Sequence, residues 1–405
     1  MFETLEQLPP DPILGLSAEF KADPNPNKVN LGVGVYKTET GETPIFGALK
    51  EAEARLIAAQ TTKGYIGQEG DPTFLAEVSK LVLGDDLYAE LGANTDNSKV
   101  SGVMTPGGSG ALRMIAGLIM RTSIGGSQPT VWATSPTWGN HFPLLESAGL
   151  KLDSYSYYDA EAGLVDFDAM MAGLGSAKAG DVVLAHACCH NPTGADLSND
   201  QWDTLIDHCA DKQLVLFIDM AYQGLAQGLD EDAYSIRQAA QKLPEVLVAV
   251  SSSKTFGVYR ERAGMAMVIA QADGQAQIAK SHIMTIARRT YSMSPFHGAG
   301  VIGHMLADAD LNSQWRKEID EARGRINDLR ASLTEKLNTG QDTRDFSYIA
   351  KNQGMFSILG LSKDQAVQMR KDAGVYILNS SRINVAGLTR ANIDTVVSAV
   401  HAVLN

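Results

Sequence analysis

The chain has 405 residues, of which 44% are hydrophobic and 20% are charged, a composition typical of a folded globular protein. Its 34 basic and 47 acidic residues give a formal net charge of −13, which argues against nucleic acid as a partner because nucleic-acid-binding proteins present a basic face. Three cysteines, an odd and sparse number, favour a reducing compartment over a disulfide framework. Residues 1–6 lack the character of a leader peptide, and no apolar run is long enough for a membrane span. We therefore expect a cytoplasmic protein that acts on small molecules.

The N-terminal residues 1–44 are rich in proline and asparagine and predict an irregular arm with one short apolar segment at 29–35. At ~150 residues per domain, the length suggests two to three domains. We expect residues 1–44 to form this arm and part of a small domain. Residues 45–315 are expected to form a large domain, and residues 316–405 the small C-terminal domain against which the arm packs.

Short apolar runs alternate with helical patterns from about Thr73 onward. Runs of this length that are apolar on both faces and separated by helices predict an α/β fold, with a mostly parallel sheet covered by helices on both sides. A long helix with apolar residues at the helical period is expected at 311–337. Strands are expected at 99–104, 130–133, 181–185, 214–218, 245–250 and 265–269.

Polar residues stand where several of these strands end. Trp138 and Asn191 lie in loops shortly after strands, Asp219 follows the run 214–218, and Lys254 follows the run 245–250. In open α/β sheets, ligands bind outside the carboxyl ends of the strands. We therefore expect these four side chains to face one common site.

Lys254 is the strongest candidate for a nucleophile. Desolvation at a strand end lowers the pKa of a lysine toward that of a useful amine, which can then form a Schiff base. Taken alone, the pattern favours an exposed lysine after a strand. Ser251-x-x-Lys254 also matches serine acyl-enzymes, but the Ser-Asp-Asn and Lys-Thr-Gly motifs of that class are missing.

Three further patterns bear on ligands. The glycines at 107–110, ahead of an expected helix at 111–120, form either an anion site at a helix N-terminus or a tight turn. Asp219 is suited either to pairing with a buried cation or to capping the N-terminus of a helix. His186 and His190 lack the Glu of a His-Glu-x-x-His site and any supporting cluster, so no metal is expected. Arg262, Arg288 and Arg382 suit carboxylate or phosphate binding, or surface ion pairs.

Together, these pieces resemble the class I, pyridoxal-phosphate-dependent aminotransferases, and more closely the bacterial aspartate and aromatic-amino-acid enzymes. The likeness runs from Asp11 almost to the C-terminus. It implies the fold of the type I pyridoxal-phosphate-dependent transferases, with a mostly parallel seven-stranded sheet between helices and a smaller α/β domain. The motifs, in chain order, are Gly-Gly-Ser-Gly-Ala-Leu-Arg (107–113), Pro-Thr-Trp-x-Asn-His (136–141), Cys-Cys-His-Asn-Pro-Thr-Gly (188–194), Asp-x-Ala-Tyr-Gln-Gly (219–224), Ser-x-x-Lys-x-Phe-Gly-x-Tyr-x-Glu-Arg (251–262) and Ser-Arg-Ile-Asn-Val-Ala-Gly (381–387).

The resemblance implies roles for individual residues. Lys254, Asp219 and Tyr222 would be catalytic: the lysine would bind the cofactor covalently and then move a proton, the aspartate would pair with the pyridinium nitrogen, and the tyrosine would bind the phenolic oxygen. His141 and His186 would support Asp219. The expected cofactor-binding residues are Gly108, Ser109, Trp138, Asn191, Asp219, Tyr222, Ser251, Lys254 and Arg262, with Tyr65 from the partner subunit of a homodimer. The expected substrate-binding residues are Gly34, Trp138, Asn191, Phe356 and Arg382, with Arg288 from the partner subunit.

Substrate preference follows from a few positions within the resemblance. Ser109, Gly64 and Met293 depart from the pattern of strict aspartate enzymes, whereas Val35 and Lys37 follow it. We therefore expect a broad-specificity enzyme that moves the amino group of tyrosine, phenylalanine or aspartate to 2-oxoglutarate by a ping-pong mechanism. A strict aspartate aminotransferase, a lyase of the same fold and a non-catalytic binding protein are the alternatives. The presence of Arg288 and Arg382 argues against the lyase, and the presence of Lys254 and Asp219 argues against the binding protein.

Overall fold

The computed structural model describes residues 2–8, 11–93, 95, 97–122, 127–340 and 344–404. Its centre is a seven-stranded sheet in the order β2-β10-β9-β8-β7-β3-β4. Only β10 runs antiparallel to its neighbours β2 and β9, so the predicted mostly parallel sheet is confirmed. The strands are β2 (Val100–Pro106), β3 (Thr130–Ser135), β4 (Lys151–Ser156), β7 (Val182–His186), β8 (Val215–Met220), β9 (Glu245–Ser251) and β10 (Ala263–Ala270).

Both faces of this sheet are buried. Successive side chains of a strand point to opposite sides, so alternate residues of one strand pack on different faces. In β8, Leu216 and Ile218 belong to one apolar cluster, and Phe217 belongs to the cluster on the other face. Helices cover both faces: α5 (Gly107–Ile119), α6 (His141–Glu146) and α10 (Gln275–Thr290) contribute to the second cluster. The first cluster includes α3 (Pro72–Leu83), α4 (Asp85–Glu90), α7 (Phe167–Leu174), α8 (Asn199–Lys212), α9 (Tyr234–Lys242) and α11 (His297–Ala307).

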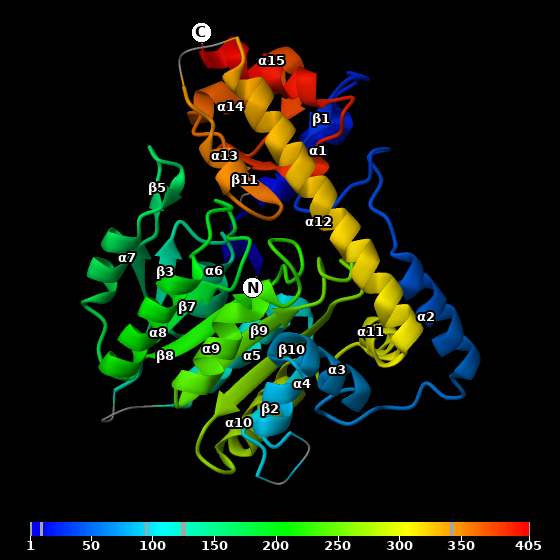
Figure 1. Ribbon diagram of the computed structural model, residues 1–405, viewed down its shortest axis with the longest axis vertical. Helices are drawn as coiled ribbons and strands as arrows, with labels where there is room; N and C mark the ends of the chain where they lie inside the picture. The colour runs from blue at the N-terminus through cyan, green and yellow to red at the C-terminus, as the bar shows by residue number, and fades with distance from the viewer. Residues whose placement is uncertain are drawn as a thin grey trace.

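The predicted long helix is confirmed as α12 (Ala309–Asn338). In Figure 1 it runs from the side of α2 (Gly47–Ala59) and α11 to the region of α13 (Tyr348–Lys351), α14 (Lys363–Ala373) and α15 (Ile393–Leu404). The proposed boundary between residues 315 and 316 therefore lies inside one continuous helix. Within the described residues, no helix is both long enough and apolar enough to cross a bilayer.

The N-terminal arm packs on the C-terminal part of the chain. β1 (Val29–Asn30) pairs in parallel with β12 (Val375–Tyr376), and the Tyr376 hydroxyl donates a hydrogen bond to Asp23 at 2.9 Å. The remaining short elements are the antiparallel pairs β5 (Tyr158–Asp159) with β6 (Leu164–Val165) and β11 (Phe356–Ile358) with β13 (Arg382–Asn384), and the 3-10 turns η1 (Phe2–Thr4), η2 (Glu231–Ala233) and η3 (Val385–Gly387).

Two elements correct the sequence-based expectations. The arm is not wholly irregular, because α1 (Pro12–Ala22) begins at Pro12, and the side chain of Asp11 accepts hydrogen bonds from two backbone N–H groups of its first turn. Aspartate at the N-cap and proline at the first position are both helix-starting signals. Strand β4 was not among the expected runs, because it is an edge strand of mostly exposed polar residues.

Candidate active site

A cavity of about 240 Å³ lies beyond the carboxyl ends of β7, β8 and β9 and brings together most of the predicted site residues. The residues come from both halves of the chain, since the arm supplies Gly34 and the C-terminal part supplies Phe356 and Arg382. Five lining residues were not predicted to bind ligand: Ile13, Leu112, His186, Ala221 and Ser253. The predicted residues that line it are Gly34, Gly108, Ser109, Trp138, Asn191, Asp219, Tyr222, Ser251, Lys254, Arg262, Phe356 and Arg382.

Two predicted residues lie outside this cavity. Tyr65 is 94% exposed, and Arg288, exposed in the last turn of α10, donates a hydrogen bond to the hydroxyl of Ser292. These are the two residues that the resemblance assigns to the site of a partner subunit.

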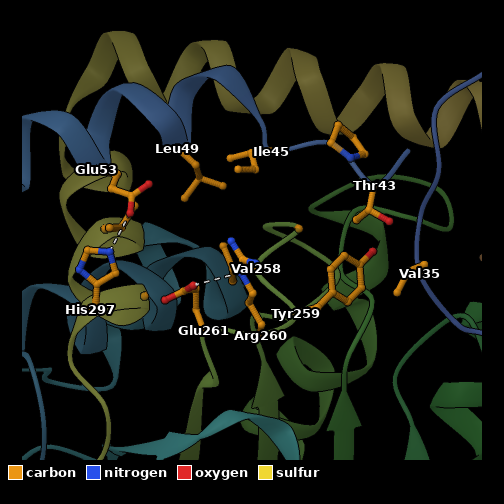
Figure 2. A pocket seen from close by; sticks show the side chains of 14 residues that line it. Val35, Thr43, Ile45, Leu49, Glu53, Val258, Tyr259, Arg260, Glu261 and His297 are labelled. Carbon is orange, nitrogen blue, oxygen red and sulfur yellow. Dashed lines mark hydrogen bonds and ion pairs between the residues drawn. The ribbon is translucent and has the colours of Figure 1, made fainter. Parts of the chain in front are cut away.

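A second cavity, of about 380 Å³, lies between the start of α2, α11 and the loop after Lys254. Figure 2 shows its lining, with Leu49 above and the ion pair between His297 and Glu53 at one side. It contains none of the predicted cofactor or substrate residues. The smaller cavity is therefore the candidate active site.

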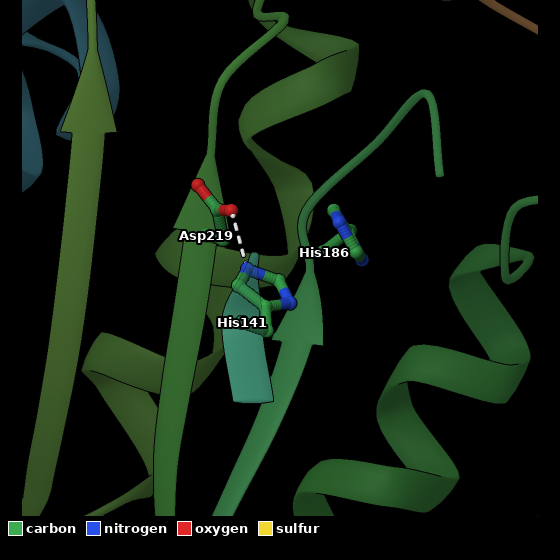
Figure 3. A group of neighbouring side chains, drawn as sticks. All are labelled: His141, His186 and Asp219. Carbon is green, nitrogen blue, oxygen red and sulfur yellow. Dashed lines mark hydrogen bonds and ion pairs between the residues drawn. The ribbon is translucent and has the colours of Figure 1, made fainter. Parts of the chain in front are cut away.

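Asp219 and His141 form the buried base of the site. Asp219 is the second-to-last residue of β8, beside His186 at the end of β7. His141 Nε2 lies 3.0 Å from Asp219 Oδ2, and His141 Nδ1 lies 2.7 Å from the hydroxyl of Thr137. Figure 3 shows the aspartate and the two histidines side by side. This arrangement fixes one oxygen of Asp219 on His141 and leaves the other for a ligand.

The environment of Asp219 favours its ionised form over the protonated acid. Burial raises the pKa of Asp219, but the hydrogen bond from His141 and the positive charge of Lys254 outweigh burial and lower it overall. Burial and the neighbouring His141 lower the pKa of His186 to about 3, so His186 is neutral. Its Nδ1 has no hydrogen-bond partner in the described structure. The metal-binding atoms of these three residues lie within 4.8 Å of one another, and the expectation that no metal binds here stays a prediction.

Lys254 is partly buried, three residues beyond β9. Burial lowers its pKa to about 8, the Asp219 carboxylate opposes that shift, and the guanidinium groups of Arg262 and Arg382 reinforce it. Its Nζ lies 5.1 Å from the centre of the Tyr222 ring. An amine with this pKa is partly unprotonated near neutral pH, as a nucleophile must be.

Arg382 lines the same cavity as Asp219, and not all of its N–H groups have a partner among the described residues. Its Nη1 donates to Asn191 Oδ1 at 3.2 Å and its Nη2 donates to the Gly32 carbonyl at 2.6 Å. The guanidinium lies 4.4 Å from the centre of the Phe356 ring. Its Nε is buried and has no partner among the described residues. A buried arginine with no carboxylate partner is suited to receive one from a ligand.

The start of α5 forms a cradle for an anion. α5 begins at Gly107, directly after β2, so the N–H groups of its first turn are free for a ligand. A Cβ on Gly108 would lie 2.8 Å from the Cβ of Ser251, so only glycine allows the helix end to approach β9 so closely. Ser109, Ser251 and Arg262 surround this end. The donor set is therefore a fit for a phosphate group.

The site residues that sequence reasoning missed differ in how they could have been found. Ile13 reaches the cavity from the first turn of α1, and the Asp11-Pro12 helix start was a visible signal. Thr137, which orients His141, is one residue from the predicted Trp138. Arg330, which supports Phe356 by a hydrogen bond to its carbonyl, lies in the middle of a long charged helix where nothing in the pattern marks it.

Comparison with known proteins identifies the chain. Residues 26–400 match the sequence profile of the family described as aminotransferase class I and II. The chain belongs to this family. It is 42% identical over 404 residues to the aspartate aminotransferase of Escherichia coli, covering 100% of both chains. It is 44% identical over 391 residues to the tyrosine aminotransferase of Rhizobium meliloti, covering 96% of this chain and 97% of the relative.

The fold comparison agrees with the sequence comparison. The aromatic-amino-acid aminotransferase of Burkholderia pseudomallei, solved covalently bound to pyridoxal phosphate, superimposes with a TM-score of 0.94 at 38% identity over 100% of both chains. The predicted family, the α/β fold, the enzyme class and the cofactor class are thereby confirmed. The aminotransferase places its Asp219, Lys254 and helix-end cradle within one cavity, which is what a charged, phosphorylated, aldehyde-bearing cofactor requires.

Proposed function

We propose that this aminotransferase moves the amino group of aspartate, tyrosine or phenylalanine to 2-oxoglutarate in two half-reactions. The observation that carries the proposal is the cavity that holds Lys254, with its lowered pKa, between the buried Asp219 and the unpaired face of Arg382. Relatives named for aspartate and for tyrosine stand at almost equal identity, 42% and 44%. That balance, together with Ser109, Gly64 and Met293, favours broad specificity over the strict aspartate alternative.

Pyridoxal phosphate supplies, when bound, an aldehyde carbon that an amine can capture and a protonated ring that withdraws electrons from the substrate Cα. Gly108, Ser109, Ser251 and Arg262 would hold its phosphate. Asp219 would keep the proton on the ring nitrogen, and Trp138 would lie against the ring. Tyr222 and Asn191, whose Nδ2 lies 3.5 Å from the Tyr222 hydroxyl, would bind the phenolic oxygen.

Lys254 would carry both chemical tasks of the protein. Its Nζ would hold the cofactor covalently. When a substrate amine is bound in its place, the same Nζ would act as the base that accepts and donates the proton of the substrate Cα. Arg382 meanwhile binds the substrate α-carboxylate, and Gly34 and Phe356 close the substrate side of the cavity.

We also propose that the enzyme is a homodimer with shared sites. Tyr65 and Arg288 are both exposed and outside the cavity of their own chain. In the proposed dimer, Tyr65 of one subunit would reach the phosphate in the other, and Arg288 would meet the side-chain carboxylate of aspartate or 2-oxoglutarate. Within each subunit, residues 45–315 would form the cofactor-binding domain, and residues 1–44 and 316–405 would supply the arm and the small domain.

The first experiment is a half-reaction. Protein saturated with pyridoxal phosphate is mixed with aspartate or with phenylalanine, without an oxo acid, and loss of the visible absorbance of the bound cofactor is followed. We expect conversion with both amino acids. Conversion with aspartate alone would establish the strict aspartate alternative, and failure to acquire the visible band would favour the non-catalytic binding protein.

Arg288→Leu should separate the two substrate classes. The variant removes a guanidinium that can pair with the side-chain carboxylate of aspartate, and hydrogen bonds to charged groups contribute about 1.5–3 kcal/mol. We expect kcat/KM for aspartate to fall about 10- to 100-fold, with a much smaller change for phenylalanine. Steady-state kinetics with both amino acids measure the difference. Arg289→Leu, at the neighbouring exposed position, is the control, and equal losses for both substrates would refute the role of Arg288.

The lowered pKa of Lys254 gives a pH prediction. Because only the neutral amine attacks an aldehyde, the rate at which cofactor-free protein captures pyridoxal phosphate should rise with pH and level off above a midpoint of about 8. An unshifted lysine would show a midpoint near 10.4. Stopped-flow absorbance across this pH range makes the measurement, and a rate still rising steeply at pH 10 would contradict the assignment.

A further inference from the structure

Arg330 is a fully buried charge held by backbone carbonyls. It projects from the middle of α12, is 2% exposed, and has no ion pair with any carboxylate of the described chain. Burial lowers its pKa to about 10, so it remains charged at neutral pH. Its guanidinium donates hydrogen bonds to the carbonyls of Ile349 at 3.0 Å, Gln353 at 3.1 Å, Gly354 at 2.7 Å and Phe356 at 2.9 Å. One side chain therefore holds the whole turn that leads into β11.

This turn is interlocked with the loop after β7. The N–H of Gln353 donates to the Gly194 carbonyl at 2.7 Å, and the Asn352 amide donates to the Thr193 carbonyl at 3.4 Å. A Cβ on Gly194, where φ is +74°, would lie 2.3 Å from the Phe356 carbonyl oxygen. The two segments approach more closely than any side chain at that position would allow, so neither can move without the other.

The two interlocked segments carry two of the three supports of Arg382, and the third is the Gly32 carbonyl of the arm, at 2.6 Å. The turn presents the Phe356 ring, 4.4 Å from the Arg382 guanidinium. The loop presents Asn191, whose Oδ1 accepts from Arg382 Nη1 at 3.2 Å. Stacking on a ring and a hydrogen bond to an amide fix the plane and the rotation of a guanidinium, which is what bidentate binding of a carboxylate requires.

We propose that Arg330 is a positioning residue that sets the orientation of Arg382, and thereby the affinity of the enzyme for the substrate α-carboxylate. The inference rests on the proposed function, because it takes Arg382 as the carboxylate-binding group. Arg330 does not itself line the cavity, and it reaches the site through its hydrogen bond to the Phe356 carbonyl. Its effect should therefore appear chiefly in substrate binding, with a smaller effect on cofactor binding through Asn191.

The test compares Arg330→Lys and Arg330→Met with the wild-type holoenzyme. A lysine keeps the charge, but its single ammonium cannot reproduce a planar fork that reaches four carbonyls. We expect KM for aspartate and for phenylalanine, and the Kd of the unreactive carboxylates succinate and 3-phenylpropionate, to rise about 10-fold or more in Arg330→Met and less in Arg330→Lys. We expect kcat to change less than about threefold, and the pyridoxal phosphate Kd to rise much less than the carboxylate Kd, because the cofactor keeps its other binding residues. Arg316→Met, at an exposed arginine of the same helix whose Nε donates to Asn312 Oδ1, is the matched control.

Two results would overturn the inference. One is an unchanged KM and carboxylate Kd in folded Arg330→Lys and Arg330→Met. The other is a loss of pyridoxal phosphate affinity that equals the loss of carboxylate affinity, since that pattern indicates general damage. If neither variant folds, Asn352→Ala tests the same route by the same criteria, because it removes the amide that donates to the Thr193 and Gly163 carbonyls without removing a buried charge. A wild-type enzyme that does not transaminate would count against the proposed function, whereas carboxylate binding tests Arg330 without turnover.

Discussion

Replacing Lys254 with alanine is expected to abolish transamination. The variant loses the amine that binds the cofactor covalently and the base that moves the proton between the substrate Cα and the cofactor. Proton transfer by a positioned side chain alone contributes about 10²- to 10⁴-fold, so kcat should fall by at least about 10⁴-fold when both tasks are lost. Steady-state and single-turnover rates with aspartate and phenylalanine measure the effect.

Two further variants make this result specific. Lys254→Arg keeps a positive charge but cannot lose its proton, so it should be as inactive as the alanine variant. Lys242→Ala removes an exposed lysine that pairs with Asp207 at 2.9 Å, and surface pairs of this kind contribute little, so it should retain full activity. Turnover near the wild-type level in Lys254→Ala would refute the catalytic assignment.

The sheet was predictable where burial leaves a pattern in the sequence. Strands β7, β8 and β9 have apolar side chains on both faces, because helices cover both sides, and such runs are visible without a structure. β4 has the sequence Lys-Leu-Asp-Ser-Tyr-Ser and lies at the sheet edge with mostly exposed residues. Its place depends on pairing with β3, a contact between segments that local sequence does not encode.

The candidate site likewise contains residues that local sequence predicts and contacts that it does not predict. Asp219 and Lys254 could be placed together from local sequence, because the carboxyl ends of neighbouring parallel strands meet at one edge. The hydrogen bond between His141 and Asp219 joins residues 78 positions apart, and Arg382 reaches the cavity only through packing of the C-terminal part against the arm. These contacts depend on tertiary structure, so they required either the resemblance or the coordinates.

Asp219→Asn is expected to produce the second large loss of activity. The asparagine has nearly the same shape and can still accept a hydrogen bond from His141, but it carries no charge to hold a proton on the cofactor ring nitrogen. Breaking a buried charge pair costs about 3–5 kcal/mol, which corresponds to a roughly 10²- to 10⁴-fold loss in kcat/KM. Half-reaction rates with aspartate measure the change.

The pH dependence distinguishes this role of Asp219 from a structural one. The environment lowers the pKa of the Asp219 carboxyl, so the wild-type residue stays ionised across the neutral range. Without the carboxylate, the ring nitrogen must take its proton from solvent, and the residual activity of Asp219→Asn should rise as the pH falls. Asp219→Glu keeps the charge and should recover part of the activity, and Asp394→Asn, at an exposed carboxylate paired with Lys336, should change nothing. An Asn variant that loses activity equally at every pH, together with its thermal stability, would mean that Asp219 acts only by holding His141 in place.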